Sequence, residues 1–210
     1  MRLFRTPFWV RWLFSQYEWK VQTQEKAIFL TFDDGPIPNL TEFVLEELAK
    51  YNAKATFFCV GDNIRKYTSI FQRIIQEGHQ VGNHTYNHLN GWKNDNSTYW
   101  QNIEKCQCLI AQNTPLLIQK PLFRPPYGKI TKTQAQQILL NYRIIMWDVL
   151  TYDFDTALSS NKCLQKAIQY TQKGSIVVFH DNLKAEKNLK FALPYYLEHF
   201  TAKGFQFKVL

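Results

Sequence analysis

The sequence predicts an α/β fold, a distorted (β/α) barrel of about seven parallel strands. Apolar, strand-like runs alternate with amphipathic helical patterns about seven times, and no long linker interrupts them. Polar residues that can carry out chemistry recur where these apolar runs end. The chain contains neither a glycine-rich dinucleotide fingerprint nor a phosphate-binding loop, so the pattern does not indicate a nucleotide-binding sheet.

Length and composition indicate one globular domain. The chain has 210 residues, of which 45% are hydrophobic, enough for a sizeable core. We expect residues 26–210 to form this domain and the aromatic, basic residues 1–25 to pack on it. Aromatic residues make up 16% of the chain, which fits either a phenylalanine-rich core or a sugar-stacking groove. The net charge of +8 comes without a basic block or a nucleic-acid-binding motif, so we expect no nucleic-acid partner.

Each expected element follows from its local pattern. Apolar runs predict strands at Ala27–Phe32, Lys54–Val60, His79–Asn83, Pro121–Arg124, Arg143–Asp148, Ser175–His180 and Phe205–Leu210. Apolar residues at helical spacing predict helices at Thr41–Tyr51, Asn63–Gln76, Thr98–Gln112, Thr131–Leu140, Leu164–Gln172 and Leu189–Phe200. Strands that alternate with helices in this way pair in parallel through right-handed crossovers.

The strand ends carry the residues that suit catalysis. In chain order these residues are Asp33 and Asp34, His84, Arg124, Asp148 and Asp153, and His180. In a barrel of parallel strands, as in a TIM barrel, the carboxyl ends of the strands form the active-site face. In an open sheet, ligands gather mostly at one switch point. Contributions from at least five strands therefore favour a closed or nearly closed barrel.

Two histidines and two adjacent aspartates have the composition of a metal centre. His84 and His88 are four residues apart, so in helical geometry their side chains share one face. Two imidazoles and a carboxylate suit a divalent ion such as zinc and leave positions for water and substrate. Neighbouring side chains diverge along an extended backbone, so we assign Asp34 to the metal and Asp33 to the base that takes a proton from water.

Two further segments can assist a reaction. In Arg-Pro-Pro-Tyr-Gly, the prolines fix the backbone so that the N–H of Tyr127 can face a developing oxyanion. Arg124 in the same segment can hold a carboxylate in a bidentate pair. A buried strand ends in His180, which can protonate a leaving amine if a carboxylate, Asp153 or Asp148, raises its pKa.

Together these motifs resemble the polysaccharide deacetylase family, the NodB-homology domain. The matching segments are Thr-Phe-Asp-Asp-Gly-Pro at 31–36, His-Thr-Tyr-Asn-His at 84–88, Arg-Pro-Pro-Tyr-Gly at 124–128, Asp-Phe at 153–154 and Val-Val-Phe-His at 177–180. The resemblance covers about residues 26–210. It implies a distorted (β/α) barrel that removes acetyl groups from sugars with a divalent metal, most often Zn²⁺, with Co²⁺, Ni²⁺ or Mn²⁺ as alternatives.

The resemblance also implies a role for each matched position. Asp33 resembles the catalytic base and Arg124 the residue that orients it. The other matched positions are the metal ligands Asp34, His84 and His88, the oxyanion donor Tyr127, the acid His180 with its tuning partner Asp153, and the pocket residues Tyr127, Phe154 and Val178.

Three positions depart from the family pattern. The fourth motif usually reads Asp-x-x-Asp-Trp, but Leu150 replaces its first aspartate and Phe154 its tryptophan. Val178 stands where a leucine is usual. These changes concern the shape of the substrate groove and leave the metal and the base intact.

We therefore expect a metal-dependent hydrolase that removes acetyl groups from N-acetylated amino sugars of peptidoglycan, chitin-like or related glycans. A deacylase of a non-sugar amide is the alternative, followed by a non-catalytic glycan-binding module. We expect no stable protein partner.

The sequence also gives expectations for the compartment. The four cysteines lack zinc-finger spacing and are expected to be reduced. We find no signal peptide and no apolar stretch near the roughly 20 residues that span a bilayer. We therefore expect a cytoplasmic protein, or one held peripherally at a membrane by weak contact through residues 1–20.

Overall fold

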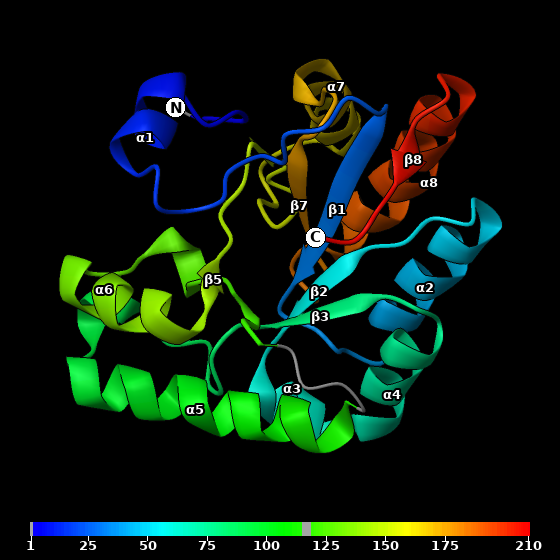
Figure 1. The fold of residues 1–210 in the computed structure, drawn as a ribbon. Coiled ribbons are helices and arrows are strands. Elements are labelled where there is room, and N and C mark those ends of the chain that lie inside the picture. The colour runs from blue at the N-terminus through cyan, green and yellow to red at the C-terminus, as the bar shows by residue number, and fades with distance from the viewer. Residues whose placement is uncertain (1, 115–118) are drawn as a thin grey trace.

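A curled sheet of parallel strands forms the centre of the protein (Figure 1). The computed structural model describes residues 2–114 and 119–210. Seven strands follow the order β5-β4-β3-β2-β1-β7-β6, and β8 pairs with β1 beside this row. The pairings among these described strands are parallel, which confirms the predicted fold class. The strands are β1 (Ala27–Asp33), β2 (Thr56–Cys59), β3 (Gln80–Asn83), β4 (Leu122–Phe123), β5 (Arg143–Ile144), β6 (Val149–Leu150), β7 (Ile176–His180) and β8 (Gln206–Phe207).

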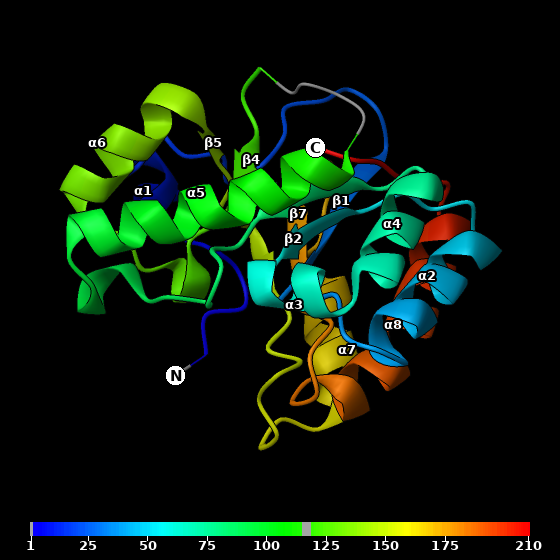
Figure 2. The same cartoon turned by 90° about the horizontal axis from the view of Figure 1, so that it is seen from below.

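Helices cover the sheet in a row that follows the strand order. Neighbouring helices contact one another in the order α7, α8, α2, α4, α3, α5, α6. Figures 1 and 2 both show α5 and α6 on one side of the molecule and α2, α4 and α8 on the other. The helices are α1 (Phe8–Leu13), α2 (Leu40–Lys50), α3 (Gly61–Lys66), α4 (Thr68–Gln76), α5 (Asn96–Asn113), α6 (Lys132–Asn141), α7 (Ser160–Tyr170) and α8 (Glu186–Ala202), with 3₁₀ turns η1 (Gly91–Lys93) and η2 (Pro126–Gly128).

Strand β1 is the centre of the core. All seven of its residues are buried, because the strand has a neighbour on each side and side chains pack on both faces. Phe32 packs against Phe57 of β2 and Phe179 of β7, with ring centroids 5.1 and 6.2 Å apart. A strand buried on both faces reads as a continuous apolar run rather than an alternating one. Its carboxyl end therefore delivers Asp33 from the middle of the sheet.

The prediction of one strand over residues 143–148 is wrong. β5 pairs with β4, whereas β6 pairs with β7 at the opposite edge of the row. The N–H of Ile145 donates to Phe123 on β4, and the N–H of Asp148 donates to Ile176 on β7. The segment changes partner because it crosses from one edge of the curled sheet to the other. Hydrophobic pattern alone does not reveal such a change.

The N-terminal segment, residues 3–20, spans the gap between these two edges. Near β6, the N–H of Leu150 donates to the carbonyl of Phe4 at 3.0 Å. Near β5, the N–H of Glu18 donates to the carbonyl of Ile144 at 2.9 Å. Helix α1, which we did not predict, lies between these two contacts in the chain. The segment therefore contributes backbone hydrogen bonds to both edges of the sheet.

Two other elements differ from their predictions. The helix expected at 63–76 is divided into α3 and α4, because Tyr67 between them has φ −126° and ψ 47°, outside the helical region. The strand expected at 205–210 contains the two residues of β8, which pair with the start of β1. The remaining predicted elements are present with shifted ends. No helix in the described ranges is long and apolar enough to cross a bilayer.

Candidate metal and catalytic site

The carboxyl ends of the strands meet around one pocket. Asp33, the last residue of β1, lies in register with His180 on β7. The pocket has a volume of about 580 Å³. It is lined by eight residues predicted from the sequence, Asp33, Asp34, His84, His88, Tyr127, Phe154, Val178 and His180, together with Ile37, Pro125, Trp147, Leu150, Asn182, Leu183 and Lys184. The two other predicted residues, Arg124 and Asp153, are fully buried behind it.

Asp34, His84 and His88 form a group that can hold a metal ion. Each residue offers one ligand atom, and these atoms lie within 4.8 Å of one another. Oδ1 of Asp34 lies 3.5 Å from Nε2 of His84 and 3.0 Å from Nε2 of His88. Burial opposes ionisation of Asp34, but the two imidazoles hold its pKa well below the usual range. The carboxylate is therefore charged at neutral pH, as a metal ligand must be.

The second nitrogen of each histidine is already engaged. Nδ1 of His84 lies 2.8 Å from the carbonyl oxygen of Arg124, which can only accept a hydrogen bond. Nδ1 of His84 therefore carries the proton, and in the neutral ring Nε2 presents a lone pair towards Asp34. Nδ1 of His88 lies 3.1 Å from the hydroxyl of Tyr127.

The histidines do not lie on a helix, so the helical interpretation of their spacing is wrong. Thr85 and His88 have φ values of 63° and 56°, in the left-handed region. The loop is held by side chains: Oδ1 of Asn83 accepts from the N–H of Thr85 at 2.9 Å, and Oγ1 of Thr85 accepts from the N–H of Leu89 at 2.9 Å. These polar residues compete with helical hydrogen bonds. The compact turn they form still places both rings together, with centroids 5.1 Å apart.

The two adjacent aspartates point to different partners. Asp33 ends β1, while Asp34 has φ 87°, so the chain turns sharply between them. Oδ2 of Asp34 accepts a hydrogen bond from Nδ2 of Asn182 at 2.5 Å. Oδ1 of Asp34 has no hydrogen-bond donor among the described residues. One buried oxygen is therefore fixed by an amide, and the other is left facing the histidines.

Arg124 holds Asp33 in place from behind. Its Nη1 donates to Oδ1 of Asp33 at 2.6 Å and to Oγ1 of Thr31 at 2.8 Å. Its Nη2 donates to the carbonyl of Met146 at 3.0 Å, and its guanidinium lies 4.1 Å from the ring centroid of Phe58. Burial lowers the pKa of Arg124, and the charge of Asp33 opposes that shift. Each charge compensates the other inside the protein.

His180 is paired with Asp153, and this resolves the choice between Asp153 and Asp148. Nδ1 of His180 lies 2.8 Å from Oδ1 of Asp153, and the backbone N–H of His180 donates to Oδ2 at 2.7 Å. Burial lowers the pKa of His180, but the charge and hydrogen bond of Asp153, with smaller contributions from the charges of Asp34 and Asp33, outweigh it and raise the pKa to about 9. Asp148 instead pairs with Arg5 and Arg11.

The pocket wall is largely apolar and aromatic. Tyr127 lies in η2 with φ 61°, and its ring packs edge-on against His88 at 4.6 Å between centroids. The ring of Phe154 packs in the same manner against His180 at 4.8 Å. A β-carbon on Gly128 would lie 2.7 Å from the indole of Trp147, so glycine is required where the turn meets that wall.

Comparison with known proteins identifies the family. The family model described as polysaccharide deacetylase matches residues 20–144, more than half of the chain. This chain belongs to the polysaccharide deacetylase family. A peptidoglycan-N-acetylglucosamine deacetylase of Bacillus cereus is 35% identical over 178 residues, which cover 83% of this chain and 62% of that protein. PgdA of Listeria monocytogenes, also named as such a deacetylase, is 33% identical over 182 residues, covering 87% of this chain and 37% of its own length.

Solved structures agree with this assignment. A crystal structure of a peptidoglycan N-acetylglucosamine deacetylase, in complex with a naphthalenyl-N-hydroxybenzamide, superimposes with a TM-score of 0.88 at 30% identity and covers 98% of this chain and 95% of that chain. Among relatives compared by sequence, a chitooligosaccharide deacetylase of Azorhizobium caulinodans is 28% identical over 205 residues, covering 91% of this chain and 96% of that protein. The chain thus spans less than two thirds of the first two relatives and nearly all of these two.

Sequence reasoning missed two polar residues that follow His180. Asn182 holds Asp34, as described above. Asp181 is fully buried, and its carboxylate accepts from the N–H of Gly35 at 3.0 Å and from the hydroxyl of Thr41 at 2.5 Å. Burial raises the pKa of Asp181 to about 7. Their position directly after a strand-end histidine was the available signal, because any residue there lies on the same face as the site.

Proposed function

We propose that this member of the polysaccharide deacetylase family is a metal-dependent hydrolase that removes the acetyl group from an N-acetylated amino sugar of a glycan. The observation that carries the proposal is Oδ1 of Asp34. It is a buried, charged oxygen without a hydrogen-bond donor among the described residues, and it faces Nε2 of both His84 and His88. Unpaired buried charge is costly, and a cation between these three atoms removes the cost.

The donor set favours zinc. Two imidazole nitrogens and one carboxylate oxygen are ligands that Zn²⁺ accepts, and Co²⁺, Ni²⁺ or Mn²⁺ can use the same set. When bound, such an ion polarises the carbonyl of the substrate and lowers the pKa of a water molecule. Asp34, His84 and His88 would hold it, with Asn182 and the carbonyl of Arg124 orienting two of these ligands.

Asp33 is suited to act as the general base. It lines the pocket beside Asp34 but bonds to Arg124, so its carboxylate is held in one orientation. In the proposed reaction Asp33 accepts a proton from the attacking water. Arg124 keeps one oxygen of Asp33 fixed, which reduces the reorganisation that proton transfer requires.

His180 is suited to protonate the departing amine. Asp153 occupies its Nδ1, so the proton that is transferred resides on Nε2. The N–H of Tyr127, in the turn fixed by Pro125 and Pro126, is the proposed donor to the oxyanion that forms when water attacks the acetyl carbonyl. The products are acetate and a free amino sugar.

The apolar wall supports a small acyl group at the reaction centre. Phe154 and Val178 line the pocket beside His180, and they are the proposed contacts for the acetyl methyl. The printed names of the relatives support a glycan as the rest of the substrate, since they refer to deacetylases of peptidoglycan and of chitooligosaccharides.

The test is acetate release from N-acetylglucosamine oligomers and from peptidoglycan by the purified chain, before and after chelation. We expect activity to disappear with chelator and return with Zn²⁺. Asp33→Asn keeps the shape of the side chain but removes the base, and we expect a loss of about 10²–10⁴-fold with bound metal unchanged. Asp62→Asn, at a partly exposed position on α3 outside the residues that line the pocket, is the matched control.

The alternatives give different results in the same assay. Activity that survives full chelation, or a wild-type rate in Asp33→Asn, contradicts the proposed mechanism. Acetate or another acid released only from non-sugar amides would support the deacylase alternative. A protein that binds glycans tightly but releases no acetate when loaded with metal would be a binding module.

A further inference from the structure

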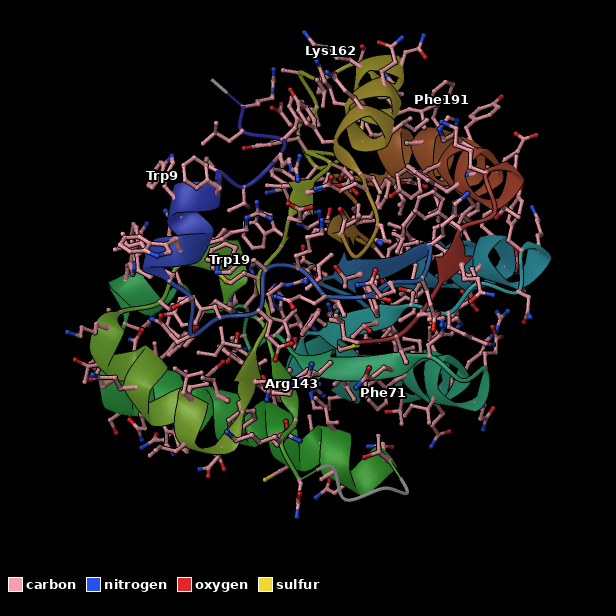
Figure 3. All side chains as sticks on the ribbon, turned by 45° about the horizontal axis from the view of Figure 1, so that its top comes forward. Trp9, Trp19, Phe71, Arg143, Lys162 and Phe191 are labelled. Carbon is pink, nitrogen blue, oxygen red and sulfur yellow. The ribbon has the colours of Figure 1, made fainter. Side chains whose placement is uncertain are left out.

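Helix α1 presents an unusual apolar face to solvent. Phe8 and Trp12 are 76% and 79% exposed, and Trp9 and Leu13 are 57% and 58% exposed. At 3.6 residues per turn, these four positions lie within an arc of about 140° on one side of the helix. Figure 3 shows Trp9 pointing outwards from α1 at the margin of the molecule. None of the six residues of α1 is buried, so this face is not a packing surface of the domain.

The residues that flank this face anchor α1 to the sheet. Val10 packs against the cluster that contains Tyr17, Trp19 and Met146. Arg11 donates through Nη1 to the buried carboxylate of Asp148 at 3.2 Å. The helix is therefore held in a defined orientation, and its aromatic face is presented by the fold rather than by a loose end of the chain.

A basic group lies beside α1. Arg5 and Arg11 share the single carboxylate of Asp148, at 3.3 and 3.2 Å. Lys20 forms a backbone bridge with Ser175, which brings it close to Lys173. Burial lowers the pKa of Lys20, and the charges of Arg5, Arg11 and Lys173 add to that effect while Asp148 opposes it. The basic group, defined as Arg5, Arg11, Lys20 and Lys173, therefore keeps a positive charge after Asp148 is counted.

We propose that α1 and the basic group dock this protein on the surface of an anionic phospholipid bilayer. The apolar rings of tryptophan and phenylalanine insert into a bilayer at the level of the lipid headgroups, and neighbouring Lys and Arg side chains attract anionic lipid. The chain as a whole carries a net charge of +8, which strengthens that attraction. A second copy fits less well, because a two-fold contact through α1 would bring two basic groups together.

The experiment measures sedimentation of the full chain with vesicles. One set contains phosphatidylcholine alone, and the other contains phosphatidylcholine with 30 mol% phosphatidylglycerol. We expect binding to the anionic set, with a partition coefficient reduced about tenfold or more by Trp9→Ser/Trp12→Ser. Trp92→Ser, a tryptophan 64% exposed on η1, is the matched control and is expected to bind as wild type does.

A second variant and a second measurement distinguish a loss of membrane binding from misfolding of the first variant. Phe8→Ser/Leu13→Ser removes the other half of the face, and brominated lipids quench tryptophan fluorescence in the wild type if Trp9 and Trp12 enter the bilayer. Anionic vesicles that fail to bind wild type, or that bind it equally after either double substitution, overturn the proposal. A wild-type dimer in light scattering that becomes monomeric in these variants, without vesicle binding, would assign the face to a second copy instead.

Discussion

Replacing Asp153 with asparagine tests the tuning of His180. The variant removes the negative charge that keeps the pKa of His180 at about 9, while the side chain keeps its shape. Burial lowers that pKa, and only the smaller effects of the Asp34 and Asp33 charges then oppose it, so the pKa should fall towards the ordinary 6.5. Because His180 must be protonated to act as the general acid, the alkaline limit of activity should move downwards in pH.

The size of the effect follows from the two pKa values. At pH 8 a histidine with a pKa of about 9 is about 90% protonated, and one at 6.5 is about 3% protonated. At pH 6 the two fractions are about 100% and about 76%. If the pKa falls fully to 6.5, the defect in kcat of Asp153→Asn relative to wild type should grow by about twentyfold between pH 6 and pH 8, and this is the upper bound because Asp34 and Asp33 remain.

The assay is acetate release at saturating metal and saturating substrate across this pH range. Asp155→Asn is the matched control, since Asp155 lies two residues away, is partly exposed and bonds to Arg2 rather than to His180. We expect its pH profile to coincide with that of wild type. A constant ratio of Asp153→Asn to wild type from pH 6 to pH 8 would refute the assignment of Asp153 as the group that tunes His180.

Three other substitutions have defined outcomes. Asn182→Leu should weaken Zn²⁺ binding about tenfold in calorimetric titration, because Oδ2 of Asp34 loses its amide donor; unchanged affinity would contradict this. Gly35→Ala should lower the free energy of unfolding by about 1–3 kcal/mol in urea, because the new β-carbon would lie 2.0 Å from Oδ2 of Asp181; an unaltered midpoint would mean that the turn yields. Arg124→Met should cost about 3–5 kcal/mol by leaving Asp33 buried and unpaired. Adding Asp33→Asn should recover part of that loss of unfolding free energy. If the effects of the two substitutions on this free energy are strictly additive, Arg124 and Asp33 do not stabilise each other.

The fold could be predicted from the sequence where pattern and pairing coincide. β1 and β7 are continuous apolar runs because both are buried, and this signal is strong in single sequences. The segment 143–148 was misjudged because hydrophobicity records burial but not which edge of the sheet a residue pairs with. Helix α1 was missed because its six residues span less than two turns, too short a stretch for the helical spacing of its apolar residues to stand out.

The residues of the site were also predictable only in part. Aspartate, histidine and arginine at strand ends could be recognised because parallel strands bring their carboxyl ends together. The turn that holds His84 and His88 depends on Asn83 and Thr85 in specific hydrogen bonds, which spacing alone does not encode. Asn182 was overlooked because an asparagine after a strand has many structural roles, and only the folded chain brings its amide to Asp34.

The closure of the sheet by residues 3–20 sets the order in which the protein can be completed during synthesis. Glu18 bonds to Arg143, 125 residues later in the chain, and Arg5 bonds to Asp148, 143 residues later. Residues 3–20 therefore cannot take their place in the fold until the segment around residues 143–148 has been synthesised. Until residues 143–150 have been made, the backbone groups of residues 3–20 have no partner in the sheet, so this segment can associate with other chains during that interval.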